Sequence, residues 1–132
     1  MARPVPTADH ENAEFWRRVH ARRLAVQRCT ACHALRFYPR AVCPECLHGG
    51  FDWVDVNGRG TLYSFTVCHR PASEAFADRT PYIVALVDLQ EGVRLLANLI
   101  DCSPERARVG MPVTLTYEEV GDGVTLYQFK PA

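Results

Sequence analysis

The chain has 132 residues, of which 48% are hydrophobic and 23% are charged, and its formal net charge is zero; these are ordinary values for one compact globular domain or two very small ones. No apolar run approaches the roughly 18 residues that a membrane-spanning helix needs, and the N-terminus lacks the apolar stretch of a secretory signal, so we expect a cytoplasmic protein. In a reducing compartment, the six cysteines favour metal binding or free thiols over disulfides.

The charge is unevenly distributed along the chain. Residues 1–44 carry eight arginines against three acidic residues, a balance of +5, whereas residues 45–132 carry seven basic and twelve acidic residues, a balance of −5. Two interpretations are open: a solvated arginine-rich face, or a surface that binds an anion or a partner protein.

A helix is the first element expected, in residues 1–23. Pro4 and Pro6 disfavour regular structure in the lead that precedes it. Apolar side chains then recur every three to four residues, which predicts an amphipathic helix from Asp9 or Asn12 to about Arg23. The apolar stripe comprises Ala13, Phe15, Trp16 and Val19. Its aromatic residues need a surface to lie on, either in this chain or on a partner.

Residues 24–50 begin with a strand at 24–28 and contain two Cys-x2-Cys pairs separated by ten residues. Two such pairs complete a tetrahedron of sulfurs, and the expected ligands are Cys29, Cys32, Cys43 and Cys46. Structural zinc (Zn2+) in a ribbon is the first interpretation, and a rubredoxin-like iron is the alternative. Four protein ligands leave no open position for catalysis. His33 is interpreted as an exposed neighbour or as a hydrogen-bond donor to a ligand.

Residues 51–132 show alternating apolar and polar segments separated by turns, which predicts short strands. The expected strands are 51–56, 61–67, 82–89, 93–100, 111–117 and 124–129, with a short helical turn at 104–108. The 82–89 segment is nearly continuously apolar, so we expect it to be buried on both faces. A mainly β protein follows, in which the helix and the ribbon precede a five-stranded OB-fold barrel.

The loop at residues 69–80 has polar residues at its two ends. Arg70 and Arg79 could hold a phosphate or carboxylate, with His69 and Tyr82 beside them; the alternative is an ordinary polar strand end. Cys68 adjoins His69, but neighbours on a strand point to opposite faces, which disfavours a Cys–His nucleophile.

The order of these motifs resembles a known family, the zinc-ribbon OB-fold proteins termed DUF35. The resemblance covers about residues 11–131. The motifs that carry it are Phe15-Trp16, Gln27-Arg28-Cys29-x2-Cys32, Phe37-x-Pro39-Arg40, Cys43-Pro44-x-Cys46, Trp53, Gly58-x-Gly60-Thr61-Leu62-Tyr63-Ser64-Phe65-Thr66, His69-Arg70, Pro81-Tyr82-x-Val84-Ala85-Leu86-Val87 and Gly110-Met111-Pro112-Val113. One departure is His33, which stands where the family often has glycine.

The resemblance implies a non-catalytic accessory subunit of a thiolase-like or lipid-transfer-protein-type enzyme: a thiolase, an acyltransferase or an aldolase that shortens steroid side chains. The ribbon and helix would dock on that enzyme, and the barrel would lie near the acyl-CoA. The residues expected to contact acyl-CoA or the partner are Phe15, Trp16, Arg28, Arg40, His69, Arg70, Arg79 and Tyr82.

Two rival functions follow from the residues. OB barrels and zinc ribbons also bind nucleic acids, but a barrel portion with a net negative charge argues against that. An independent enzyme would have to use Cys68, His69 or Arg70.

Overall fold

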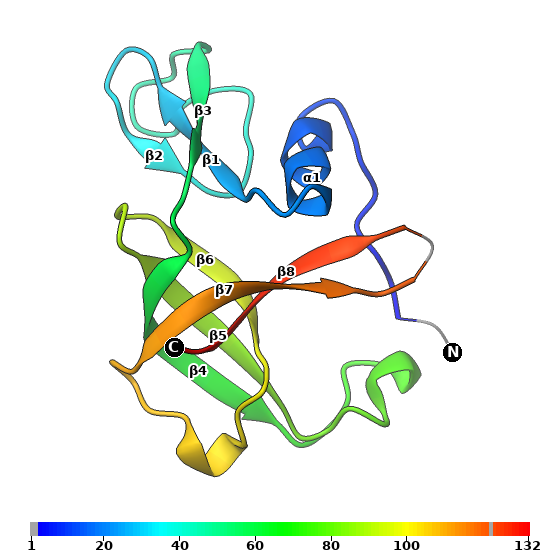
Figure 1. Cartoon of the computed structure of the whole chain (residues 1–132). Helices are drawn as coiled ribbons and strands as arrows, with labels where there is room; N and C mark the ends of the chain where they lie inside the picture. The colour runs from blue at the N-terminus through cyan, green and yellow to red at the C-terminus, as the bar shows by residue number, and fades with distance from the viewer. Residues whose placement is uncertain (1–2, 122) are drawn as a thin grey trace.

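The computed structural model describes residues 3–121 and 123–132, and it contains a small three-stranded sheet above a closed barrel, with one helix beside them (Figure 1). The elements are α1 (Ala13–His20), β1 (Ala25–Cys29), β2 (Leu35–Arg36), β3 (Phe51–Asp55), β4 (Arg59–Cys68), β5 (Tyr82–Leu89), β6 (Arg94–Leu99), β7 (Pro112–Glu119), β8 (Thr125–Pro131) and the 3-10 turns η1 (Glu74–Phe76) and η2 (Pro104–Arg106). No helix in these two ranges is long and apolar enough to cross a membrane.

The helix is shorter than the sequence predicts, because it ends at His20. Arg22 adopts a left-handed conformation with φ of 61°. Its amide donates to the carbonyl of Val19, and the Arg23 amide donates to that of Arg18. These two bonds form a Schellman motif, which ends a helix. Arginine occupies the position where glycine is usual, so no local residue pattern marks the end of the helix.

The small sheet has the strand order β2-β1-β3, with both neighbours antiparallel to β1. β3 is paired with β1 along its whole length, from Ala25 opposite Asp55 to Cys29 opposite Phe51. The expectation that residues 51–55 begin the barrel was therefore wrong. Ladder hydrogen bonds to β1 keep this segment in the ribbon, and the chain enters the barrel at β4.

The barrel closes in the order β4-β5-β6-β8-β7, which confirms the predicted five-stranded OB-fold. β6 and β8 run parallel and pair only at Leu99 and Phe129. β5 is not buried on both faces: Ile83, Ala85 and Val87 point into the barrel, whereas the residues between them are half-exposed. Its continuous apolar sequence thus reflects one core face and one partly open face.

The helix, the ribbon and the barrel meet in a cluster of five aromatic rings, which we call the aromatic joint: Phe15, Trp16, Phe37, Tyr38 and Tyr127. The Phe15 ring centroid lies 5.7 Å from Phe37, 5.5 Å from Tyr38 and 5.9 Å from Tyr127. The Trp16 indole donates a 2.7 Å hydrogen bond to the Tyr38 hydroxyl. The core runs without a break from α1 and β1 into the barrel.

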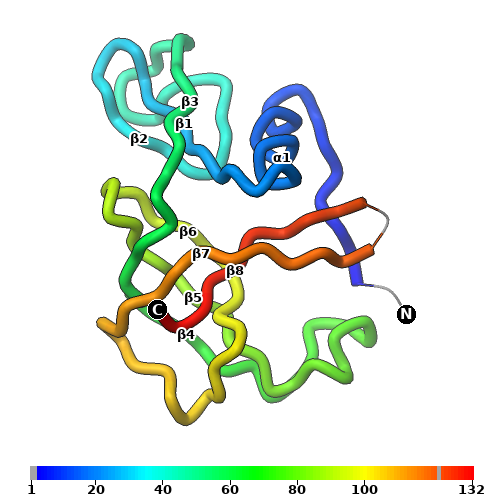
Figure 2. Tube along the Cα trace, in the orientation of Figure 1, coloured from blue at the N-terminus to red at the C-terminus, as the bar shows by residue number. Residues whose placement is uncertain are grey.

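The segment that precedes α1, described from residue 3 onward, also contacts the barrel. It runs past the β7–β8 hairpin (Figure 2), where the Arg3 guanidinium lies 2.9 Å from the Glu118 carboxylate. This pair anchors the start of the described chain on the barrel.

Candidate metal centre

Two backbone turns of the same design present the four cysteines. In the first, the His33 amide donates to the Cys29 carbonyl, and the Cys29 amide donates to the Ala34 carbonyl. In the second, the corresponding bonds join Leu47 to Cys43 and Cys43 to His48. The residue after the second cysteine is left-handed in both turns, with φ of 65° at His33 and 67° at Leu47. Glycine adopts this conformation most easily, so both turns hold a residue with a side chain where glycine would be favoured.

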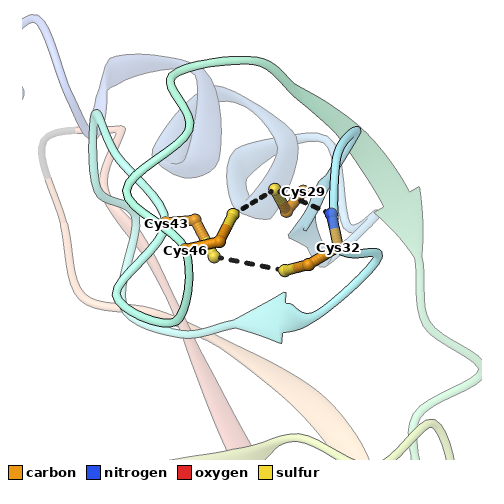
Figure 3. Close-up of side chains that lie close together, drawn as sticks. All are labelled: Cys29, Cys32, Cys43 and Cys46. Atoms are coloured by element: carbon orange, nitrogen blue, oxygen red, sulfur yellow. Dashed lines mark hydrogen bonds between the residues drawn. The ribbon is translucent and has the colours of Figure 1, made fainter.

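The four sulfurs converge on one point between the two turns (Figure 3). All four lie within 4.8 Å of one another; Cys29 Sγ is 3.5 Å from Cys46 Sγ, and Cys32 Sγ is 3.6 Å from Cys43 Sγ. A tetrahedral site with zinc–sulfur bonds of about 2.3 Å has sulfur–sulfur edges of roughly 3.8 Å. Small movements of the four sulfur atoms would bring their separations to the edges of that tetrahedron. Cys29 and Cys43 are buried, whereas Cys32 and Cys46 reach the surface.

The backbone prepares two of these thiols to ionise. The amides of Cys32 and Ala31 point at the Cys29 sulfur and hold the pKa of its thiol down at about 6. The amides of Cys46 and Glu45 likewise lower the pKa of Cys43. The Ala34 amide also lowers the pKa of Cys32, but burial and hydrogen bonds with the other thiols outweigh it and raise that pKa to about 12. A set of crowded thiolates of this kind fits a soft divalent cation.

A layer of polar side chains braces the two turns. The buried Gln27 accepts hydrogen bonds from the Arg36 side chain (2.9 Å) and the Arg40 amide (2.8 Å). Arg36 also donates to the Arg40 carbonyl at 2.9 Å. Gln27 and Arg36 were not among the predicted site residues. They are polar residues on the two strands that flank the first cysteine turn, and the structure pairs them opposite each other.

The residues expected to contact a partner lie in different environments. Phe15 has no exposed surface, because the aromatic joint surrounds it; proposing it as a contact residue was wrong. Trp16 is half-buried in the same joint. Arg28 and Arg40 are exposed on the ribbon.

The four arginines of α1 and of the turn that follows it form ion pairs within the chain and share three carboxylates. Each guanidinium lies 2.6–2.8 Å from a carboxylate, in the pairs Arg17–Glu14, Arg18–Glu14, Arg22–Glu119 and Arg23–Asp55. Of the two interpretations of the basic N-terminal half, a solvated ion-paired face describes these four residues.

The predicted contact residues around the 69–80 loop, namely His69, Arg70, Arg79 and Tyr82, do not form one site. Arg79 and Tyr82 line a cavity of about 310 Å³ at one end of the barrel, together with Arg3, Cys102 and Glu118. Arg79 lies 3.7 Å from the Glu118 carboxylate. His69 and Arg70 are exposed and are not part of the lining.

Comparison with known proteins identifies the two halves. Residues 18–53 match the family model "ChsH2, rubredoxin-like zinc ribbon domain", and residues 53–118 match "ChsH2, C-terminal OB-fold domain". A DUF35 domain-containing scaffold protein of Methanothermobacter thermautotrophicus is 35% identical over 91% of this chain and 94% of its own length. The chain belongs to the DUF35 family. Its four cysteines are thus the zinc-ribbon metal site that the sequence predicts.

Other relatives belong to enzyme complexes. The solved structure titled "Ltp2-ChsH2(DUF35) aldolase" is 41% identical, with a TM-score of 0.86, over 96% of this chain and 98% of that one. The benzoylsuccinyl-CoA thiolase subunit BbsA of Thauera aromatica is 34% identical over 78% of this chain and 71% of its own length.

One relative is much longer than this chain. A probable enoyl-CoA hydratase alpha subunit of Thermomonospora curvata is 44% identical over 98% of this chain. The chain spans only 40% of that relative's length.

Proposed function

We propose that this DUF35 chain is a non-catalytic accessory subunit that docks on a thiolase-like enzyme, stabilises it and helps to hold an acyl-CoA substrate. The observation that carries the proposal is a metal site with four protein ligands, in a chain whose relatives are named as a scaffold, a thiolase subunit and part of an aldolase. A metal with four thiolates has no free position for substrate, so its task is structural.

The residues outside the metal site support the same proposal. In the described part of the chain, Cys68 is a free half-buried thiol and His69 is exposed on the next residue. Neither makes a side-chain hydrogen bond among the described contacts, so the pair lacks the third group that orients a Cys–His nucleophile. The chemistry is therefore assigned to the partner.

The ribbon is the proposed docking surface. Arg28 and Arg40 are exposed there and form no ion pair within the described ranges, in contrast to the helix arginines. The cavity beside Arg79 and Tyr82 is the proposed site near acyl-CoA, because a guanidinium suits phosphate. A cytoplasmic location is also proposed, since reduced thiolates persist in that compartment.

Copurification tests the accessory role. The full chain is co-expressed with a candidate thiolase-like enzyme from the same organism, and we expect a stable complex with higher partner activity. Arg28→Glu and Arg40→Glu should weaken the complex at least tenfold. Arg106→Glu, an exposed residue of η2, is the matched control and should bind normally. Absence of both complex formation and any change in partner activity would contradict the proposal, as would acyl-CoA turnover by the isolated chain that Cys68→Ala abolishes.

A further inference from the structure

Among the described residues, no carboxylate forms an ion pair with Arg36, whose positive charge is buried. The residue is only 5% exposed. Its Nε donates to Gln27 Oε1 and its Nη2 to the Arg40 carbonyl, both at 2.9 Å, and its guanidinium carbon lies 4.9 Å from the centre of the Phe51 ring. Its Nη1 is buried without any acceptor among the described residues.

This environment is the reverse of the one around the arginines of α1 and of the turn that follows it. The guanidiniums of Arg17, Arg22 and Arg23 are at least half-exposed, yet each has a carboxylate within 3 Å. Arg36 is the more costly charge to bury, because water no longer solvates it, and neutral hydrogen-bond acceptors compensate only part of that cost. A buried guanidinium therefore points to a source of negative charge nearby that is not a carboxylate.

The strand register places one metal ligand, Cys29, on the same face as Arg36. Arg36 pairs with Gln27, and Cys29 pairs with Phe51. Gln27 and Cys29 are two residues apart on β1, so their side chains point the same way, and paired residues share a face. The Arg36 guanidinium lies over Phe51 on that face. Its other hydrogen bond, to the Arg40 carbonyl, holds the segment that leads into Cys43.

We propose that Arg36 is the counter-ion of the metal–thiolate centre. A divalent cation with four thiolates carries a net charge of about −2, which a nearby guanidinium offsets in a medium that screens charge weakly. Arg36 is a positioning residue: it stabilises the loaded site through its charge and touches no substrate. The inference concerns the ribbon alone and does not depend on the proposed accessory function.

Zinc affinity separates the charge of Arg36 from its hydrogen bonds. Competition with a chromophoric chelator gives the Kd of the full chain for zinc. Arg36→Gln, which keeps a polar side chain but removes the charge, should weaken binding about 10- to 100-fold, the usual effect of losing a residue that supports metal ligands. Arg36→Lys keeps the positive charge but loses the planar guanidinium group. Its Kd for zinc should stay within about threefold of that of the unchanged chain.

Arg59→Gln is the matched control, because it removes an exposed arginine at the start of β4, outside the ribbon and the proposed docking surface; its Kd should also stay within about threefold. Equal losses in Arg36→Lys and Arg36→Gln would overturn the proposal, since hydrogen-bond geometry would then be the cause. An unchanged Kd in Arg36→Gln would overturn it too.

Thermal unfolding with and without zinc separates the counter-ion role from a purely structural one. A purely structural role would lower the Tm of the loaded and the metal-free chain equally. Arg36→Gln should reduce the rise in Tm that zinc gives, while leaving the Tm of the metal-free chain unchanged or higher. Equal lowering of both Tm values would contradict the proposal. If Arg36→Gln does not fold, the Kd of Arg36→Lys decides alone: retained affinity supports the counter-ion role, and a tenfold loss overturns it.

Discussion

The ribbon and the barrel are stabilised by different means. The barrel buries large apolar side chains, among them Leu62, Ile83, Leu95 and Phe129, each with 3% exposure or less. In the ribbon, the apolar start of β1 joins that core, but the buried residues nearest the two turns include Cys29, Cys43 and the polar Gln27 and Arg36. So small a sheet cannot bury enough apolar surface to fold alone, and metal binding supplies the missing free energy. In the ribbon, the metal therefore takes the place of a hydrophobic core.

The aromatic joint complicates this division, because it connects the two regions. Phe37 and Tyr38 come from the ribbon, Tyr127 from the barrel and Phe15 from the helix between them. The Leu24 amide also donates to the Tyr117 hydroxyl of β7 at 2.9 Å, so the ribbon begins already tied to the barrel. Loss of the metal should therefore loosen the ribbon and weaken the joint, while the barrel keeps its own core.

The largest effect is expected from losing a ligand. Cys43→Ser should abolish stoichiometric zinc binding and unfold the ribbon, since structural zinc contributes on the order of 10 kcal/mol in small zinc domains. Metal analysis and circular dichroism check this. Cys68→Ser, a half-buried cysteine outside the cluster, is the control and should bind one zinc as before. Normal zinc content in Cys43→Ser would show that the four sulfurs are not the site.

The second-largest effect is expected from a substitution in the aromatic joint. Phe15→Ala removes a fully buried ring and should lower the free energy of unfolding by about 3–5 kcal/mol, through lost burial and the cavity left behind. Urea unfolding measures the change, with the half-exposed Phe76→Ala as the control. A loss below about 1 kcal/mol would mean that the joint does not couple the helix to the ribbon and barrel.

A smaller effect is expected at the hydroxyl of Tyr38. This oxygen accepts hydrogen bonds from the Trp16 indole at 2.7 Å and the Asn12 amide at 3.1 Å. Tyr38→Phe leaves the Trp16 indole without a partner and the Asn12 side-chain nitrogen with only its longer hydrogen bond to the Thr7 carbonyl, at 3.4 Å. The change should destabilise the chain by about 1–3 kcal/mol. The exposed Tyr63→Phe is the matched control. Equal stability of the two variants would show that the Tyr38 hydroxyl does not hold the joint.

The smallest effect is expected at the helix surface. The Arg17 side chain, and then Arg18, hold the pKa of Glu14 at about 2, against an ordinary value of 4.5. A carboxyl whose pKa is lowered by folding stabilises the protein above pH 4.5 and loses that contribution as the pH falls towards 2. The pairs are solvent-accessible, so Glu14→Gln should cost only about 0.5 kcal/mol at pH 7. Denaturant titrations at pH 7 and pH 3 should show a smaller difference from the unchanged chain at pH 3.

Much of this structure could be predicted from the sequence where a local pattern has a single physical cause. The spacing of Cys29, Cys32, Cys43 and Cys46 identifies the metal site, because only a shared ligand requires it. Alternation in 61–67 identifies a barrel strand, which the structure extends to Arg59–Cys68. The paired turns also follow from the cysteine spacing.

The remaining features depend on contacts that are distant in sequence. Whether residues 51–55 pair with β1 or with the barrel is decided by register, which the sequence does not reveal. The burial of Phe15 depends on Tyr38 and Tyr127, which come from two other regions. Arg36 looks like any surface arginine until its register with Gln27 is known.

The most direct test of the claim that the metal replaces a core is hydrogen exchange of the full chain before and after a chelator removes zinc. The division of roles predicts that amides of β1 and β2 lose most of their protection, whereas those of β5 and β7 keep theirs. Simultaneous loss of protection in all four strands, in one cooperative transition, would contradict it, because the ribbon and barrel would then share a single source of stability.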